Sequence, residues 1–292
     1  AAAAWLAVVV GLGVMAGRAE GVEVCRVADL ALVTQTGEFF LAAGFLIMGV
    51  STTLFVMLAF KAHHDKRQFF FCACFITVTG CFAYYAMLSG QAWLITPNCR
   101  QLFYVRYLDA AVSIPLAFLA MGLIAGADKT LIAAVMGGGL MLVFAGFMSA
   151  ITGGFIKWLW FSMGLVVLIP LLLAVLVGFK TSADRRHPSI PDLYSKLSGL
   201  IAASLALSPV VFLFSAGLSQ WSPNFEILVY ALLDVASKVA FGFVMLLSHE
   251  AMDNAAGVPM HAEPMASKDK EPPQSYGSRS MRPVSRPVEA YI

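Results

Sequence analysis

The sequence predicts an all-α membrane protein, a bundle of seven transmembrane helices with the N-terminus outside and the C-terminus in the cytoplasm. Hydrophobic residues make up 60% of the chain and charged residues only 12%, and the mean hydropathy is +0.81. That composition is far more apolar than the composition of a soluble domain. Each span needs about 20 apolar residues, and the 292 residues contain seven such runs, separated by polar, glycine or proline residues. The net charge of +2 argues neither for nor against a nucleic-acid partner, but the sequence has no basic stripe that alternates with aromatic residues, so no such partner is predicted.

The first residues predict a cleaved signal peptide at 1–19. Residues 1–15 are apolar but too short for a comfortable span, and small residues follow them up to Ala19. The alternative is an apolar leader that is retained and packs on the membrane. Residues 20–36 are then expected to form an extracellular N-terminal segment.

Seven helices are expected within a domain that spans residues 37–250. Their bounds are roughly 38–62, 69–90, 103–126, 130–151, 155–179, 194–218 and 225–249. One side of this bundle collects most of the basic residues, namely Lys61, Lys66, Arg67, Lys129, Lys180, Arg185, Arg186 and Lys196. Only Arg26, Arg100 and Lys157 fall on the other side, so the positive-inside rule makes the first side cytoplasmic. Residues 251–292, rich in proline, serine and charge, are expected to form a disordered cytoplasmic tail.

The cysteines divide into two groups. Three lie on the second span and are most simply small core residues: Cys72, Cys74 and Cys81. Cys25 and Cys99 are both expected outside, where a disulfide can form, but spacing alone leaves open whether they pair. No cysteine or histidine pair has the spacing of metal ligands, so no metal site is predicted.

The most informative residue is Lys238, which lies inside the apolar run from Ile227 to Ser248. A charged side chain within the membrane costs several kcal/mol, so such residues are candidates for function. Asp234 lies one helical turn before Lys238, which puts a carboxylate and an amine on one helix face. A structural ion pair between helices is the alternative.

The third span supplies partners for this lysine. Arg106, Asp109 and Ser113 follow one another at intervals of one turn and therefore line one stripe of the helix. With Asp234 and Lys238 they give two acids and two bases, an arrangement that a purely structural bundle core does not need.

These two segments resemble signatures of the microbial (type 1) rhodopsins, bacteriorhodopsin-like seven-helix retinal proteins. The stretch Leu233-Asp234-Val235-Ala236-Ser237-Lys238 resembles the seventh-helix signature, and Arg106-Tyr107-Leu108-Asp109 with Ser113 and Pro115 resembles the third-helix signature. The likeness extends over about residues 36–250. It continues through Tyr84-Tyr85-Ala86-Met87, Trp158 to Phe161, Pro209 and Asn224-Phe225-Glu226.

The resemblance implies a light-activated protein without enzymatic activity that carries all-trans retinal as a protonated Schiff base on Lys238. It implies that Asp109 is the primary counterion and proton acceptor, and that Asp234 is the second counterion. Arg106 resembles the gate towards the outside, Ser113 the hydroxyl that bonds the acceptor, and Glu226 one member of a proton-release pair. The implied retinal slot is lined by Tyr84, Ala110, Trp160, Phe161, Gly164, Leu205, Ser208 and Pro209. For Tyr84, Trp160, Phe161 and Pro209, ordinary helix packing is an equally simple interpretation.

The sequence departs from the family pattern in residues of the retinal pocket and of the proton path. Ala110 stands where the pumps usually carry a tryptophan, and Leu205 and Ser208 replace aromatic residues, so the pocket is expected to be looser. Ala120 occupies the position of the cytoplasmic proton donor. Without a donor, recovery of the proton should be slow and should depend on pH. A second release-group carboxylate is also absent near Gly217.

Three functions stay open. A light-driven outward proton pump with slow reprotonation is favoured, with retinal, protons and the lipid bilayer as partners. The alternatives are a photosensor that signals through a long-lived intermediate and a light-gated ion channel. A channel is expected to carry acidic side chains along the second helix, and residues 69–90 contain none. The leader suggests a cell-surface membrane, and homo-oligomerisation stays open.

Overall fold

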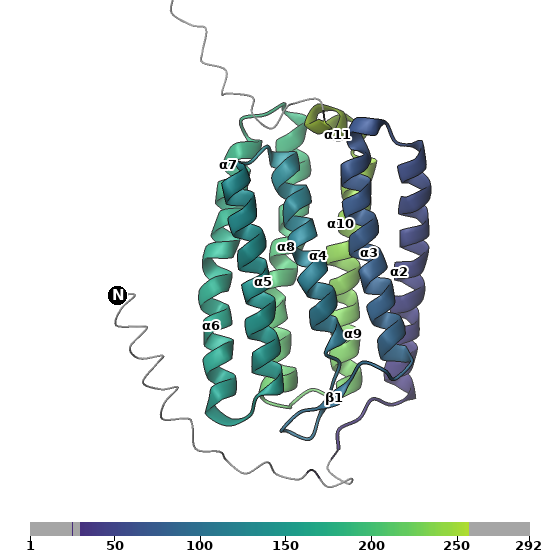
Figure 1. The fold of residues 1–292 in the computed structure, drawn as a ribbon, viewed down its shortest axis with the longest axis vertical. Coiled ribbons are helices and arrows are strands. Elements are labelled where there is room, and N and C mark those ends of the chain that lie inside the picture. The colour runs from purple at the N-terminus through teal and green to yellow at the C-terminus, as the bar shows by residue number, and fades with distance from the viewer. Residues whose placement is uncertain (1–24, 26–29, 257–292) are drawn as a thin grey trace, which may run out of the picture. The chain divides into compact units, whose positions relative to one another are not determined.

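The computed structural model describes residue 25 and residues 30–256, which fold into a bundle of nearly parallel and antiparallel helices (Figure 1). The signal peptide expected at 1–19 and the tail beyond residue 256 lie outside the described residues. The helical elements are α2 (Gln35–Lys61), η2 (His64–Lys66), α3 (Arg67–Leu88), α4 (Val105–Ala125), α5 (Lys129–Ile151), α6 (Gly154–Leu173), η3 (Ala174–Phe179), α7 (Lys180–Ala183), α8 (Ser189–Phe212), η4 (Leu213–Gly217), α9 (Pro223–Asp234), η5 (Val235–Ala240), α10 (Phe241–Leu247) and α11 (His249–Ala256).

Within the described residues, seven helical stretches are long and apolar enough to cross a membrane, which confirms the predicted architecture. They are Gln35–Lys61, His64–Leu88, Val105–Ala125, Lys129–Ile151, Gly154–Ala183, Ser189–Gly217 and Pro223–Leu247. The sixth begins earlier than expected because Pro191 lies in its first turn, where a missing N–H breaks no helical hydrogen bond. The fifth runs on to Ala183 because π-helical η3 continues it without a break.

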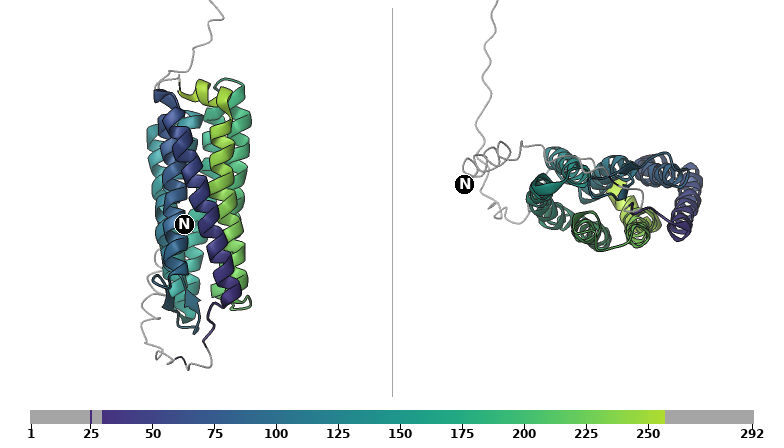
Figure 2. Two further views of the ribbon diagram at one scale, coloured as in Figure 1. Left: turned by 90° about the vertical axis from the view of Figure 1, so that its right-hand side faces the viewer. Right: turned by 90° about the horizontal axis from the view of Figure 1, so that it is seen from below.

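Short connections set the order of the helices. Asp128 caps α5 by accepting a hydrogen bond from the backbone N–H of Thr130 at 2.9 Å, directly after Gly126 ends α4 in a left-handed conformation. Consecutive helices from α2 to α6 pack against each other, and α2 also packs against α9 (Figure 2). This contact closes the bundle and places the last span against the first, second and sixth.

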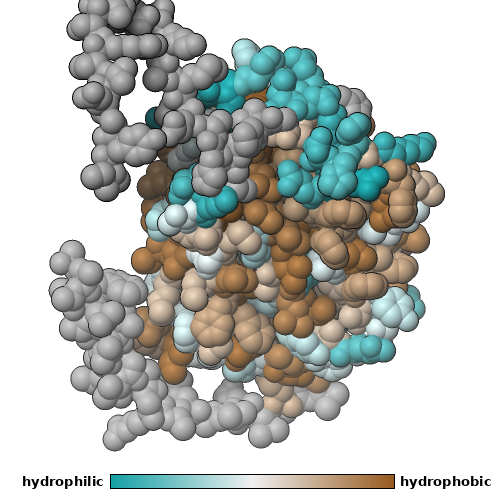
Figure 3. All heavy atoms as spheres, turned by 45° about the horizontal axis from the view of Figure 1, so that its top comes forward, coloured by the Kyte–Doolittle hydropathy of each residue, from teal (hydrophilic) through white to brown (hydrophobic). Residues whose placement is uncertain are grey.

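The outer and inner surfaces of the bundle follow the membrane's requirements. Large apolar side chains cover the outside, and Phe60, Phe39 and Leu232 are 82%, 68% and 62% exposed (Figure 3). Without lipid this exposure would be costly, so it marks the bilayer-facing surface. Phe118 and Tyr194, by contrast, are fully buried between helices.

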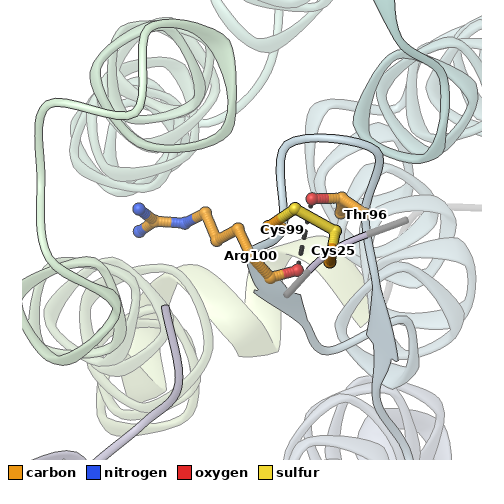
Figure 4. Close-up of a disulfide and its surroundings, with 4 residues drawn as sticks. All are labelled: Cys25, Thr96, Cys99 and Arg100. Atoms are coloured by element: carbon orange, nitrogen blue, oxygen red, sulfur yellow. Dashed lines mark hydrogen bonds between the residues drawn. A yellow bond between two sulfur atoms is a disulfide. The ribbon is translucent and has the colours of Figure 1, made fainter. Parts of the chain in front are cut away.

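A small hairpin closes one end of the bundle, which we call the hairpin end. Strands β1 (Leu94–Ile95) and β2 (Gln101–Leu102) pair antiparallel, with Leu94 opposite Leu102. A disulfide joins Cys25 to Cys99 next to this hairpin, with a Cα–Cα distance of 5.5 Å (Figure 4). The structure therefore pairs the two cysteines whose bonding the sequence left open.

The opposite end, which we call the α11 end, is covered by helix α11. The prediction that disorder begins at residue 251 is corrected here, because residues 251–256 belong to this helix. Ala251, Met252 and Ala255 are buried in the main hydrophobic cluster of the bundle, and α11 packs against α8 and α4. Burial of this apolar face holds the helix in place, a stabilisation that composition averaged over the whole tail does not reveal.

Candidate functional site

The centre of the bundle holds a charged group formed by Lys238, Asp109 and Asp234. The Lys238 amine forms an ion pair with Asp109 Oδ2 and lies 2.9 Å from Asp234 Oδ1. The side chains of Lys238 and Asp109 are 6% and 3% exposed, so both charges are removed from solvent. Two acids from different helices thus face one amine, as the sequence predicted.

Local helix geometry aims these groups at each other. Helix α9 ends at Asp234, and the chain continues as a π-helix, η5, that contains Lys238. π-Helical turns are rare in proteins, and many of those that occur lie at functional sites. Asp109 lies in the second turn of α4 and faces inward one turn before Ser113. The carboxylate of α4 and the amine of η5 therefore meet although 129 positions separate them in the sequence.

The two acids have different surroundings. Asp234 accepts a hydrogen bond of 2.8 Å from the Tyr84 hydroxyl through Oδ2. Asp109 Oδ1 is buried and has no hydrogen-bond partner among the described residues. Ser113, one turn along α4, does not donate to it. The two carboxylates thus differ in their protein partners, since only Asp234 accepts a hydrogen bond from a tyrosine hydroxyl.

A cavity of about 210 Å³ extends from this charged group between the helices. Its wall includes seven of the expected pocket residues: Ala110, Trp160, Phe161, Gly164, Leu205, Ser208 and Pro209. Tyr84 is the exception, since it is not among the lining residues and contacts the site through Asp234. Asp109, Asp234 and Lys238 line the charged part of the cavity, and Trp160, Phe161 and Leu168 belong to its apolar wall.

The chemistry of this cavity is specific. An amine beside an apolar cavity can condense with the aldehyde of a long apolar molecule, which the walls then hold by burial. The resulting nitrogen stays cationic when carboxylates stand next to it. Asp109 and Asp234 meet this requirement, and either carboxylate can in principle accept a proton from the nitrogen.

A second charged cluster lies between this group and the hairpin end. Glu226 accepts hydrogen bonds from Arg100 Nε at 3.1 Å and Arg100 Nη2 at 2.6 Å, both at Oε2. Its other oxygen, Oε1, accepts one from Arg106 Nη1 at 3.2 Å. The guanidinium carbon of Arg106 also lies 4.1 Å from the centre of the Tyr230 ring. Arg106 thus lies between the two charged groups, since it lines the cavity and pairs with Glu226.

Sequence reasoning missed two members of this outer cluster. The sequence analysis counts Arg100 only among the basic residues of the outer side, although its side chain is buried, with 4% exposed. Tyr230 is not among the residues that the sequence predicts for the site, although it lies four residues after Glu226 and four before Asp234, on the same helix face. The spacing of Tyr230 was a usable signal. The contact of Arg100 with Glu226 depends on the fold of the hairpin, so no sequence pattern indicates it.

The half of the bundle towards the α11 end is apolar, unlike the half that holds the two charged groups. Ala120 is fully buried there, among apolar neighbours that include Met121 and Ile124. The buried polar residues in the inner part of this half are Ser51, Thr77 and Ser198, none of which is an acid. Among the described residues, no carboxylate stands between the Lys238 amine and this end that could serve as an internal proton donor.

Comparisons with known proteins agree with this geometry. Residues 35–252 match the sequence profile of a family described as bacteriorhodopsin-like protein. The chain is 28% identical to Opsin-1 of Neurospora crassa over 239 residues, which cover 75% of this chain and 78% of Opsin-1. It is also 28% identical to Sensory rhodopsin-2 of Natronomonas pharaonis over 244 residues, which cover 83% of this chain and 98% of that protein.

The fold comparison gives the same result. The crystal structure of cyanorhodopsin from the cyanobacterium Calothrix sp. NIES-2098 matches with a TM-score of 0.74 at 29% identity, over 77% of this chain and 100% of that one. The family match covers all seven spans and includes Lys238 with both of its acids. The chain therefore belongs to the bacteriorhodopsin-like proteins, the microbial type 1 rhodopsins.

Proposed function

We propose that this protein is a light-driven outward proton pump that binds all-trans retinal covalently at Lys238. The observation that carries the proposal is the Lys238 amine, held by Asp109 and Asp234 beside an apolar cavity. A transporter that only needed a structural ion pair would not require an apolar cavity beside the amine.

The cavity suits retinal on two counts. Its apolar wall, which includes Trp160, Phe161 and Leu205, can bury a polyene and ring, and the amine lies where an aldehyde would react. When bound, retinal supplies the light absorption and the change of shape that reorients the Lys238 nitrogen. The protein supplies position, charge and a dry pocket.

The proposed transfer moves one proton from the Lys238 nitrogen to Asp109. Before light, the cationic nitrogen is stabilised by both carboxylates, and charges this deeply buried interact strongly. A small displacement of the nitrogen from Asp109 Oδ2 weakens that attraction and favours the neutral pair. We assign Asp109 as the acceptor because it forms a direct ion pair with the Lys238 nitrogen, whereas Asp234 also accepts a hydrogen bond from Tyr84. Asp234 stays ionised as the remaining counterion.

The direction of transport follows from the basic residues. Lys61, Arg67, Lys129 and Lys180 lie at or near the helix ends that face the α11 end. The positive-inside rule therefore supports a cytoplasmic α11 end and an outer hairpin end. In that orientation, Asp109 and Arg106 lie on the outward path, and the Lys238 nitrogen is reprotonated from the cytoplasm.

A photosensor is the second candidate. The relative named Sensory rhodopsin-2 and the apolar half around Ala120 both favour it, because slow reprotonation would keep a light-induced state populated. A light-gated channel is less supported, since α3 carries no acidic residue in its interior.

The test is a measurement of light-induced pH change in unbuffered cells that express the protein with added retinal. We expect a sustained acidification of the medium that a protonophore abolishes and that Asp109→Asn removes. A coloured pigment with no sustained pH change would reject the pump and favour the sensor. Voltage-clamp currents that reverse with the proton gradient would identify a channel instead.

A further inference from the structure

We infer that Arg100 holds Glu226 as a permanent anion, so that Glu226 neither stores nor releases a proton and outward release from this protein follows cytoplasmic uptake. The inference rests on the proposed proton transfer from the Lys238 nitrogen to Asp109. It differs from the role in proton release that the family resemblance implies for Glu226.

The first step is the occupancy of the Glu226 carboxylate. Arg100 contacts Oε2 through two nitrogens, at 3.1 and 2.6 Å, and Arg106 contacts Oε1 at 3.2 Å. Both oxygens therefore accept from charged donors, an arrangement that only the ionised form can satisfy fully. A proton on either oxygen would displace one guanidinium from its partner.

The second step is the charge balance. In the outer cluster, two arginines share one acid, whereas in the inner group one lysine faces two acids. The six charges balance only when Glu226 is ionised. Neutral Glu226 would leave two buried guanidinium groups side by side without an anion, and an uncompensated buried charge is strongly destabilising. Protonation of Glu226 is therefore opposed by both neighbours.

The third step is the anchoring of Arg100. Its backbone carbonyl accepts hydrogen bonds from the N–H and the hydroxyl of Thr96 at 2.9 and 3.2 Å, next to the Cys25–Cys99 disulfide (Figure 4). Its Nη1 also donates to the carbonyl of Trp221 at 2.6 Å. Figure 4 shows the guanidinium extending from the hairpin in between the helices. With its backbone and side chain both held in place, Arg100 stays with Glu226, whereas Arg106 reaches Glu226 through a single hydrogen bond.

The order of proton movements follows. Asp109 takes the proton from the Lys238 nitrogen, and no proton leaves Glu226 at that moment because Glu226 carries none. The nitrogen then regains a proton from the α11 end. Asp109 releases its proton towards the hairpin end only after that, so one proton enters and one leaves in each cycle, in this sequence.

A flash experiment on the retinal-loaded wild-type protein in detergent tests this order with a pH-indicator dye. We expect the dye to report alkalinisation first and a return to the starting pH afterwards. An acidification that precedes uptake would overturn the inference. A missing sustained acidification in cells, with the dye order as expected, would instead reject the proposed pump and leave the inference standing.

Infrared difference spectra test the role of Arg100 directly. We expect no light-induced protonated-carboxyl band that disappears in Glu226→Gln. We expect such a band to appear in Arg100→Gln and to vanish in the double variant. Lys157→Gln is the matched control, since Lys157 is 5% exposed, lies in the same half, and its amine donates to the Ala216 carbonyl at 2.9 Å rather than to a carboxylate. If the spectra of Arg100→Gln were identical to those of the wild type, Arg100 would not be the residue that keeps Glu226 ionised. The wild-type dye measurement decides the order even if Glu226→Gln fails to fold.

Discussion

The two halves of the bundle differ in the polarity of their buried side chains. From the Lys238 amine to the hairpin end, charged and hydroxyl groups follow each other closely: Asp109, Asp234, Tyr84, Arg106, Glu226 and Arg100. From the same amine to the α11 end, the buried side chains are almost all apolar, and helix α11 covers the exit. The polar half can stabilise a displaced charge. In the proposed pump, the apolar half would make the return of a proton slow, and this difference would give the transfer its direction.

The largest effect is expected from removing the amine where the two halves meet. In Lys238→Ala, retinal has no nitrogen to bond, so we expect no absorption band in the visible range on addition of retinal. The control is Lys157→Ala, because Lys157 is equally buried and does not line the cavity. A normal band in Lys238→Ala would contradict the assignment of the attachment site.

The next effect tests the polar half. Asp109→Asn removes a negative charge that stabilises the cation at the Lys238 nitrogen, so the absorption band should move to longer wavelength and proton transfer should stop. Asp234→Asn is the matched comparison and should leave transfer measurable, because Asp109 remains. The measurement combines steady-state spectra with the dye assay, and an unchanged spectrum in Asp109→Asn would reject it as the counterion.

The third prediction tests the apolar half. Ala120→Asp adds a proton donor to the side that lacks one, and a positioned general acid typically contributes 10²-fold or more, so recovery after a flash should become about 10²-fold faster. Ala120→Asn adds similar volume without a proton and should not accelerate recovery. Equal rates in the two variants would mean that the apolar half is closed over more than one residue.

The smallest effect concerns the cover at the α11 end. Lys66 forms an ion pair with Asp253 of α11, and such partly exposed pairs contribute about 0–1 kcal/mol. Lys66→Gln should therefore loosen α11 slightly and speed recovery by less than about fivefold. Lys196→Gln, which breaks the pair of Lys196 with Asp192 within α8, should leave recovery unchanged. A slower recovery in Lys66→Gln would contradict a covering role for α11.

The sequence allowed the seven spans and the inner charged group to be predicted, for a physical reason. Long apolar runs have few folding solutions in a bilayer, and Lys238, Asp109 and Asp234 lie at helical spacings within such runs. Arg100 and α11 could not be predicted in the same way. Arg100 reaches Glu226 across 126 positions through a hairpin whose shape no periodicity reveals, and α11 depends on three apolar side chains that are buried against the bundle.

The hairpin brings surface chemistry close to the interior. Cys99, bonded to Cys25, is the direct neighbour of Arg100, so one peptide unit separates a covalent cross-link from a buried guanidinium. Thiol reagents that open this cross-link would act on the electrostatics of the bundle without entering it. The optical and kinetic behaviour of the pigment would then respond to the redox conditions of the compartment that the hairpin faces, and expression hosts should be chosen with that in view.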